Sequence, residues 1–242
     1  MSDRKHETRQ QLDTTRSDIK ALKLIQPVSK RNQVVAAFKD AILRGEIQPG
    51  DAIVESRVAQ QLGAGVPLVR EALIELEHRG YVQKAPYKGT TVTKLERSHV
   101  EQIFRLRIEL ETLAIEWAKE SAKPADLDHL RGLTAKMKRA AETLDLDEFY
   151  DNDMAFHLKL WEMSGNSYLV ECLERLVVPL FAFYVMKNRR DRESYLASVA
   201  KHEKLIEALS KLSKAKLRDL MRASLADWKV ETLDQLAPDE TN

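Results

Sequence analysis

The second half of the chain, from Glu96 to residue 236, shows a single kind of pattern: apolar residues recur at the three- and four-residue spacing of amphipathic helices. Short breaks separate the predicted helices, which are 97–120, 124–143, 146–163, 167–187, 191–210 and 214–236. We find no strand signal in this half. Helices joined by short breaks bury their apolar faces against one another. The sequence therefore predicts an all-helical antiparallel bundle over residues 96–236.

The segment before the bundle, residues 29–94, mixes helical and strand-like patterns. The predicted elements are helices at 29–44, 55–62 and 67–79, followed by β-prone runs at 81–85 and 90–93 around a turn. Helix, helix, turn, helix and hairpin are the elements of a winged helix-turn-helix. A small α+β domain without a role in DNA binding has the same elements and remains the alternative. The predicted fold class is thus mainly α, with a winged helix-turn-helix followed by a helical bundle.

Composition narrows the class of protein further. The chain has 242 residues, of which 43% are hydrophobic and 32% charged, as in helix-rich globular proteins. Residues 1–28 are polar and predict a flexible N-terminal arm. No apolar run is long enough for a membrane span or a secretory signal, so we expect a cytoplasmic protein with no membrane partner. The single cysteine, Cys172, lies in an apolar helical pattern and is expected to be buried.

Several segments resemble a known family of regulators. The first domain resembles the DNA-binding domain of the GntR family through segments 41–50, 55–63 and 69–92. The second resembles the FadR-type ligand-binding domain, or FCD domain. The matching pieces are Leu106-Arg107, Leu110-Glu111, Asp153, Phe156-His157, Ser164-Gly165-Asn166 and His202. The resemblance implies a DNA-binding transcription regulator that is a homodimer and binds a double-stranded DNA operator with inverted half-sites.

The third predicted helix is the expected recognition helix. Pro67 suits its first position, and Arg70 in the first turn can bind guanine or phosphate through its planar guanidinium. An ion pair within the domain is the alternative for Arg70. The residues predicted to contact the DNA backbone are Arg57, Lys84 and Lys88. Many relatives have a Ser/Thr-Arg pair before this helix, whereas this chain has Gly65-Val66, so an operator sequence cannot be transferred from them.

The predicted bundle carries a set of candidate metal ligands. Asp153 and His157 are four residues apart on one helix, so their side chains share a face. By the resemblance, His202 joins them and can complete a site for a divalent metal such as Zn, Ni or Mn. Family members often have a histidine at the position of Ser224, and serine is a poor ligand for these metals. A hydrogen-bonded polar cluster without metal is the alternative.

The resemblance also implies effector-binding residues, which are Arg107, Asn166 and Ser224. Arg107 matches an arginine that faces the family's cavity, where a guanidinium can bind the carboxylate of a small organic acid. A structural pair with Glu111, one turn further on, is the alternative. The overall hypothesis is that the protein is a repressor and not an enzyme. A carboxylate-bearing metabolite is expected to control its binding to the operator. The competing hypotheses are a metal-dependent hydrolase and a helical scaffold that has lost DNA binding.

Overall fold

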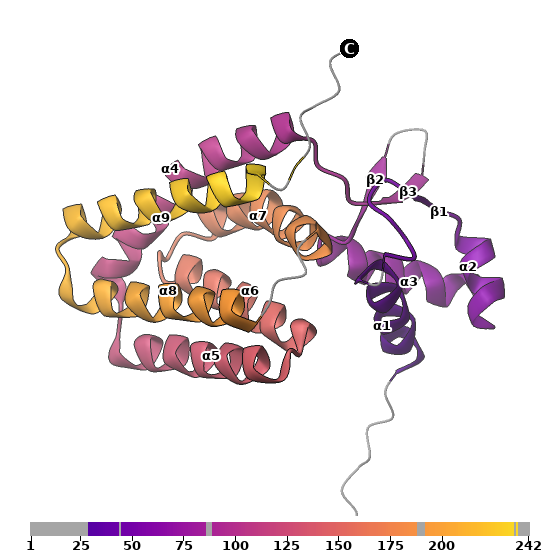
Figure 1. The fold of residues 1–242 in the computed structure, drawn as a ribbon, viewed down its shortest axis with the longest axis horizontal. Helices are drawn as coiled ribbons and strands as arrows, with labels where there is room; N and C mark the ends of the chain where they lie inside the picture. Colours follow the sequence, from indigo (N-terminus) through magenta and orange to yellow (C-terminus); the bar gives the residue numbers. More distant parts are fainter. Residues whose placement is uncertain (1–28, 44, 86–88, 188–191, 235, 237–242) are drawn as a thin grey trace, which may run out of the picture.

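The first domain has the predicted order of elements. The structure, a computed structural model, describes residues 29–43, 45–85, 89–187, 192–234 and 236. The elements of this domain are α1 (Lys30–Leu43), β1 (Ala52–Ile53), α2 (Glu55–Leu62), α3 (Val66–His78), β2 (Val82–Ala85) and β3 (Gly89–Val92). They lie together at one end of the molecule (Figure 1). The predicted arm, residues 1–28, and the centre of the predicted turn, 86–88, lie outside the described residues.

A small antiparallel sheet forms the wing, in the order β1-β3-β2. Val82 pairs with Val92 in the hairpin, and Ala52 pairs with Thr91 on the other edge of β3. The sequence predicted the hairpin but not β1, because two residues are too few to show an alternating pattern.

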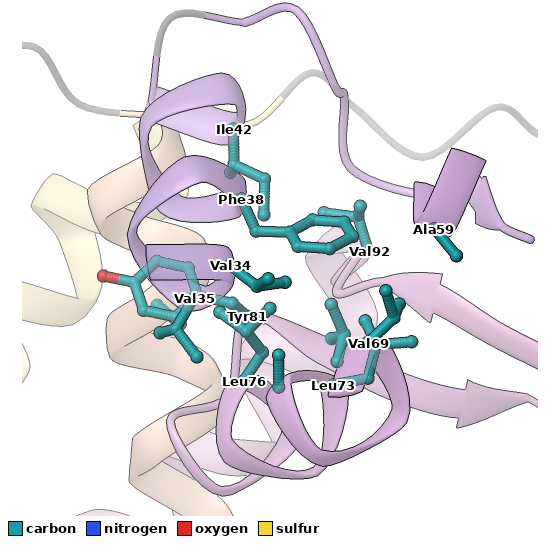
Figure 2. Close-up of a cluster of buried hydrophobic side chains, with 13 residues drawn as sticks. Val34, Val35, Phe38, Ile42, Ala59, Val69, Leu73, Leu76, Tyr81 and Val92 are labelled. Carbon is teal, nitrogen blue, oxygen red and sulfur yellow. The ribbon is translucent and has the colours of Figure 1, made fainter. Parts of the chain in front are cut away.

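The core of this domain forms where α1 and α3 pack against the hairpin (Figure 2). Its fully or largely buried side chains include Val34, Val35, Phe38, Ile42, Ala59, Val69, Leu73, Leu76, Tyr81 and Val92. The spacing of these residues on α1 and α3 is that of one helical face, which explains why both elements form helices and where they dock. Ala182, from the second domain, also belongs to this core.

The second domain is all-helical throughout its described part, as predicted. Its elements are α4 (Arg97–Ser121), α5 (Pro124–Thr143), α6 (Leu146–Glu162), α7 (Ser167–Lys187), α8 (Arg192–Lys211) and α9 (Lys214–Asp234). The helix α4 lies along α9, while α5 packs against both α6 and α8 (Figure 1). Together the two domains confirm the predicted fold class.

The helix α7 runs through the middle of the molecule and contacts both domains. Leu173, Val177 and Leu180 are fully buried in the bundle, whereas Ala182 lies in the core of the winged helix domain. Cys172 is exposed, contrary to the prediction, because its position on α7 faces away from the apolar stripe. None of the described helices combines the length and apolar character needed to cross a membrane.

Close packing and two ion pairs join the domains. Gly80, which follows α3, has a positive φ of 73°, and a Cβ there would lie 2.7 Å from the Val178 carbonyl oxygen. Lys39 of α1 binds Asp147 of α6 at 2.9 Å, and its Nζ lies over the Tyr81 ring. One turn further along α6, Asp151 lies 3.4 Å from Arg79. The helix α6 therefore holds the DNA-binding domain by two carboxylates.

Candidate functional site

The predicted metal ligands come together inside the bundle. Asp153 and His157 project from α6 and His202 from α8, and one donor atom of each lies within 4.8 Å of the others. Asp153 Oδ1 is 2.8 Å from His202 Nε2 and 3.7 Å from His157 Nε2, and the two Nε2 atoms are 3.4 Å apart. Ligands around a metal at bonds of about 2.1 Å are separated by roughly 3–3.5 Å. The spacing, the donor types and the burial of all three groups fit a divalent cation.

Burial and mutual charge shift the protonation of these groups. Burial lowers the pKa of His157 to about 4, so its imidazole is neutral at neutral pH. Burial also acts to lower the pKa of His202, but Asp153, together with the Ser198 carbonyl and the charge of Glu111, raises that pKa above the usual value. For Asp153, burial acts to raise the pKa, while the charge and hydrogen bond of His202 lower it. The cluster thus holds one carboxylate and at least one neutral imidazole, the forms that bind metal ions.

Next to the cluster lies a buried ion pair on α4. Arg107 Nε donates to Glu111 Oε1, and both side chains are essentially inaccessible to solvent. Trp228 of α9 covers the guanidinium, whose central carbon is 4.0 Å from the centroid of the indole ring. The structural alternative considered for Arg107 therefore exists. Burial lowers the pKa of this arginine, which the charge of Glu111 counteracts.

Polar atoms around this pair lack hydrogen-bond partners. Within the described part of the chain, they include Arg107 Nη1, Glu111 Oε2, His157 Nδ1 and Trp161 Nε1. Buried polar groups in folded proteins are nearly always paired with protein, water or ligand. Their concentration around one cluster points to a place where polar ligands bind.

The other two predicted effector residues have different positions. Asn166 accepts a hydrogen bond from the Leu169 backbone N at 3.1 Å and so caps the N-terminal end of α7. Ser224 is exposed on α9, whereas Asp153 and His202 are buried and the side chain of His157 is 12% exposed. No hydrogen bond joins either residue to the cluster among the described residues. The effector role of Asn166 and Ser224 therefore stays a prediction, without a hydrogen bond in the described residues that links either to the cluster.

On the DNA-binding domain, Arg70 is the fifth residue of α3, and its side chain is already paired. Its guanidinium binds Glu55 at the start of α2, with Nη2 2.9 Å and Nε 3.2 Å from Oε2. This hydrogen bond and the Glu55 charge raise the pKa of Arg70. The pair is the intradomain alternative that the sequence left open. The side chain of Arg70 is nonetheless 62% exposed, so the guanidinium remains accessible to a second partner.

The other predicted DNA contacts vary in their setting. Arg57 is exposed on α2, and Lys84 is exposed on β2 with its Nζ 3.6 Å from Glu77. Pro67 is the second residue of α3, because the helix begins at Val66 behind Gly65, which adopts the extended backbone of an N-cap. Lys88 lies outside the described residues.

Of the partners of the two candidate arginines, sequence reasoning left one open and missed another. Glu55, which reaches Arg70 across 15 positions, is the partner in the intradomain ion pair that the sequence left as an alternative. Trp228 occupies an apolar position of α9 that is indistinguishable from a core position in sequence. Only the Arg107–Glu111 pair left a signal, their separation of four residues on one helix.

These features define the class of protein once the family models are considered. Residues 30–92 match the model of the bacterial regulatory proteins of the gntR family, and residues 102–227 match the model of the FCD domain. The chain belongs to the GntR family and is a DNA-binding transcription regulator with an FCD domain.

Individual relatives agree with this assignment. The HTH-type transcriptional regulator McbR of Escherichia coli (strain K12) is 32% identical over 151 residues, which are 62% of this chain and 68% of that protein. The gluconate operon transcriptional repressor of Bacillus licheniformis is 25% identical over 198 residues, 80% of this chain and 79% of that protein. The solved structure of E. coli McbR/YncC matches with a TM-score of 0.64 and 27% identity, covering 86% of this chain and 99% of that one. These relatives are named as regulators, which favours regulation over the enzymatic alternative.

Proposed function

We propose that the chain is a homodimeric repressor whose operator binding is controlled by a divalent cation and a small organic acid in the helical domain. The observation that carries this proposal is the position of the buried Asp153, His157 and His202 cluster. Two of its members lie on α6, the helix that also holds the DNA-binding domain through Asp147 and Asp151. A change in the position of α6 therefore affects both the cluster and the contact with the DNA-binding domain.

The residues present favour a three-ligand centre. Two imidazoles and one carboxylate are donors that suit Zn²⁺, Ni²⁺ or Mn²⁺, and no fourth protein ligand joins them among the described residues. A cation held in this way offers an open coordination position to an oxygen of an effector carboxylate. The buried Nη1 of Arg107, which lacks a partner, supplies a charged donor nearby. A small organic acid is the ligand class that matches both features.

The DNA-binding part of the proposal rests on α3. In a winged helix-turn-helix the N-terminal residues of the recognition helix meet base edges, and Arg70, the fifth residue of α3, has most of its side chain exposed. A dimer that presents two such helices requires an operator with inverted half-sites. The exposed side chains of Arg57 and Lys84 are the contacts that we propose with the DNA backbone.

The experiment measures operator affinity by fluorescence anisotropy, with DNA from the region upstream of the gene. Titrations are run with a chelator, with Ni²⁺, and with Ni²⁺ plus each of a panel of small organic acids. We expect at least one acid to weaken operator binding in the presence of metal, and His157→Ala to remove the response. His129→Ala, which changes an exposed histidine on α5, is the matched control and should respond like the parent.

Two results would reject parts of this proposal separately. Operator affinity that neither metal nor any acid alters would remove the sensing role while leaving the DNA-binding assignment intact. A light-scattering mass near 27.7 kDa at micromolar concentration, unchanged by DNA, would reject the dimer.

A further inference from the structure

Two buried polar atoms face each other next to the candidate cluster, and neither has a hydrogen-bond partner. They are Oε2 of Glu111 on α4 and Nδ1 of His157 on α6, which are 3.8 Å apart. The side chain of Glu111 is 0% exposed, so water from outside does not satisfy it. Leaving buried polar groups unpaired costs free energy of folding. The position of this carboxylate oxygen opposite the ring nitrogen therefore needs a physical explanation.

The carboxylate of Glu111 is fixed by its other oxygen. Arg107 lies one turn earlier on α4, and its Nε donates to Oε1. Trp228 covers the same guanidinium, which prevents it from moving towards solvent. Rotation of the carboxylate would break this buried ion pair, so Oε2 stays directed at His157.

The two ring nitrogens of His157 face different groups. Nε2 faces Asp153 and His202 at 3.7 and 3.4 Å, while Nδ1 faces Glu111. A histidine nitrogen that binds a metal carries no proton, so the ring proton must lie on the other nitrogen, where it needs an acceptor. His202 already has this arrangement, because its Nδ1 is 2.8 Å from the Ser198 carbonyl oxygen. Glu111 stands in the equivalent place for His157.

We propose that Glu111 is a positioning residue for His157: its Oε2 accepts the proton of Nδ1 and thereby leaves Nε2 unprotonated and directed into the cluster. Arg107 holds the carboxylate in this orientation. If Oε2 of Glu111 and Nδ1 of His157 approach each other by about 1 Å, they lie within normal hydrogen-bond distance. The functional value of the free Nε2 rests on the proposed metal centre, whereas the position of the proton does not.

The substitution Glu111→Gln tests this role with little change in shape. Its amide oxygen would face the Arg107 donor, which turns the NH₂ group towards His157. Nδ1 would then accept a hydrogen bond, and the ring proton would move to Nε2, the nitrogen that faces the cluster. Glu109→Gln is the matched control, because Glu109 lies on the same helix in an exposed pair with Arg222.

The first measurement is long-range proton–nitrogen NMR on metal-free protein with ¹⁵N-labelled histidine, the His157 signals being assigned from His157→Ala. We expect the Nδ1–H tautomer in the parent and in Glu109→Gln, and the Nε2–H tautomer in Glu111→Gln. An Nε2–H tautomer in the parent, or no change in Glu111→Gln, overturns the proposal. If Glu111→Gln does not fold, the parent spectrum decides alone.

The second measurement is titration calorimetry with Ni²⁺ alone. Loss of an outer partner of a ligating histidine weakens metal binding by about 10–100-fold, which is the loss expected for Glu111→Gln. Glu109→Gln should bind like the parent, and His157→Ala should not bind at this site. Binding lost in His157→Ala but unchanged in Glu111→Gln leaves the metal centre intact and rejects the role of Glu111. If the parent binds no Ni²⁺, the metal centre fails, and the NMR result still decides the position of the proton.

Discussion

Each domain contains an arginine–glutamate pair, and the two pairs have the same chemistry in opposite surroundings. In the DNA-binding domain, the side chains of Arg70 and Glu55 are 62% and 31% exposed. In the helical domain, those of Arg107 and Glu111 are 1% and 0% exposed. An exposed pair contributes little to stability because water solvates either partner when they separate. A buried pair cannot separate without leaving an uncompensated charge.

This difference assigns different tasks to the two arginines. Because the pair is exposed, Arg70 can exchange Glu55 for a phosphate or a guanine in the proposed complex with DNA. Arg107 remains bound to Glu111, and it orders the interior around the candidate ligands. Exposure, and not the identity of the partners, therefore makes Arg70 the arginine that DNA can reach, whereas Arg107 offers only its Nη1 to a small ligand inside the bundle.

The largest expected effect comes from breaking the buried pair. Arg107→Ala leaves the carboxylate of Glu111 buried without its cation and should lower the free energy of unfolding by about 3–5 kcal/mol. Urea denaturation followed by circular dichroism measures this loss. Arg222→Ala, which removes an exposed pair with Glu109, is the control and should leave the transition nearly unchanged. Equal stability of the two variants would contradict the comparison.

A pair between the domains provides an intermediate case. The side chain of Lys39 is 7% exposed and that of its partner Asp147 is 47% exposed. Asp147→Ala strands a buried ammonium and should cost about 1–3 kcal/mol of stability. Lys39→Met leaves a carboxylate that water already reaches, so it should cost less. Urea denaturation of both variants tests this order, and a larger loss in Lys39→Met would refute the explanation by burial.

The smallest effect on stability is expected at the exposed pair of Arg70 and Glu55. There the affinity for operator DNA is the quantity that should change. Arg70→Ala should weaken operator binding roughly 5- to 150-fold, the range for loss of one good base contact. Its urea transition should match that of the parent, because both partners remain hydrated. Anisotropy with operator and with unrelated DNA separates the specific contribution. Unchanged operator affinity would show that Arg70 serves only the pair with Glu55.

Local pattern was enough to predict most of the fold. The predicted bounds of α2 and α5, 55–62 and 124–143, agree with the structure because apolar spacing, proline and glycine act over a few residues. The same reasoning placed Asp153 and His157 on one face of α6, and their convergence with His202 came from the family resemblance.

Contacts between distant segments could not be predicted in this way. Whether Ser224 points into the bundle depends on the rotation of α9, which packing against α4 sets. The exposure of Cys172 likewise depends on which side of α7 meets its neighbours. A four-residue spacing offered the pair of Arg107 and Glu111 as an alternative, but its burial under α9 follows only from the tertiary structure.

The central claim is that occupation of the buried cluster and DNA binding are coupled through α6. Such coupling is reciprocal, so operator DNA must change the affinity for metal by the same factor as metal changes the affinity for operator. The most direct test is the dissociation constant for Ni²⁺, measured by calorimetry on the free protein and on protein saturated with operator DNA. The account predicts a difference of about fivefold or more between the two values, which Asp147→Ala should reduce. Equal Ni²⁺ affinities in the two states would contradict it.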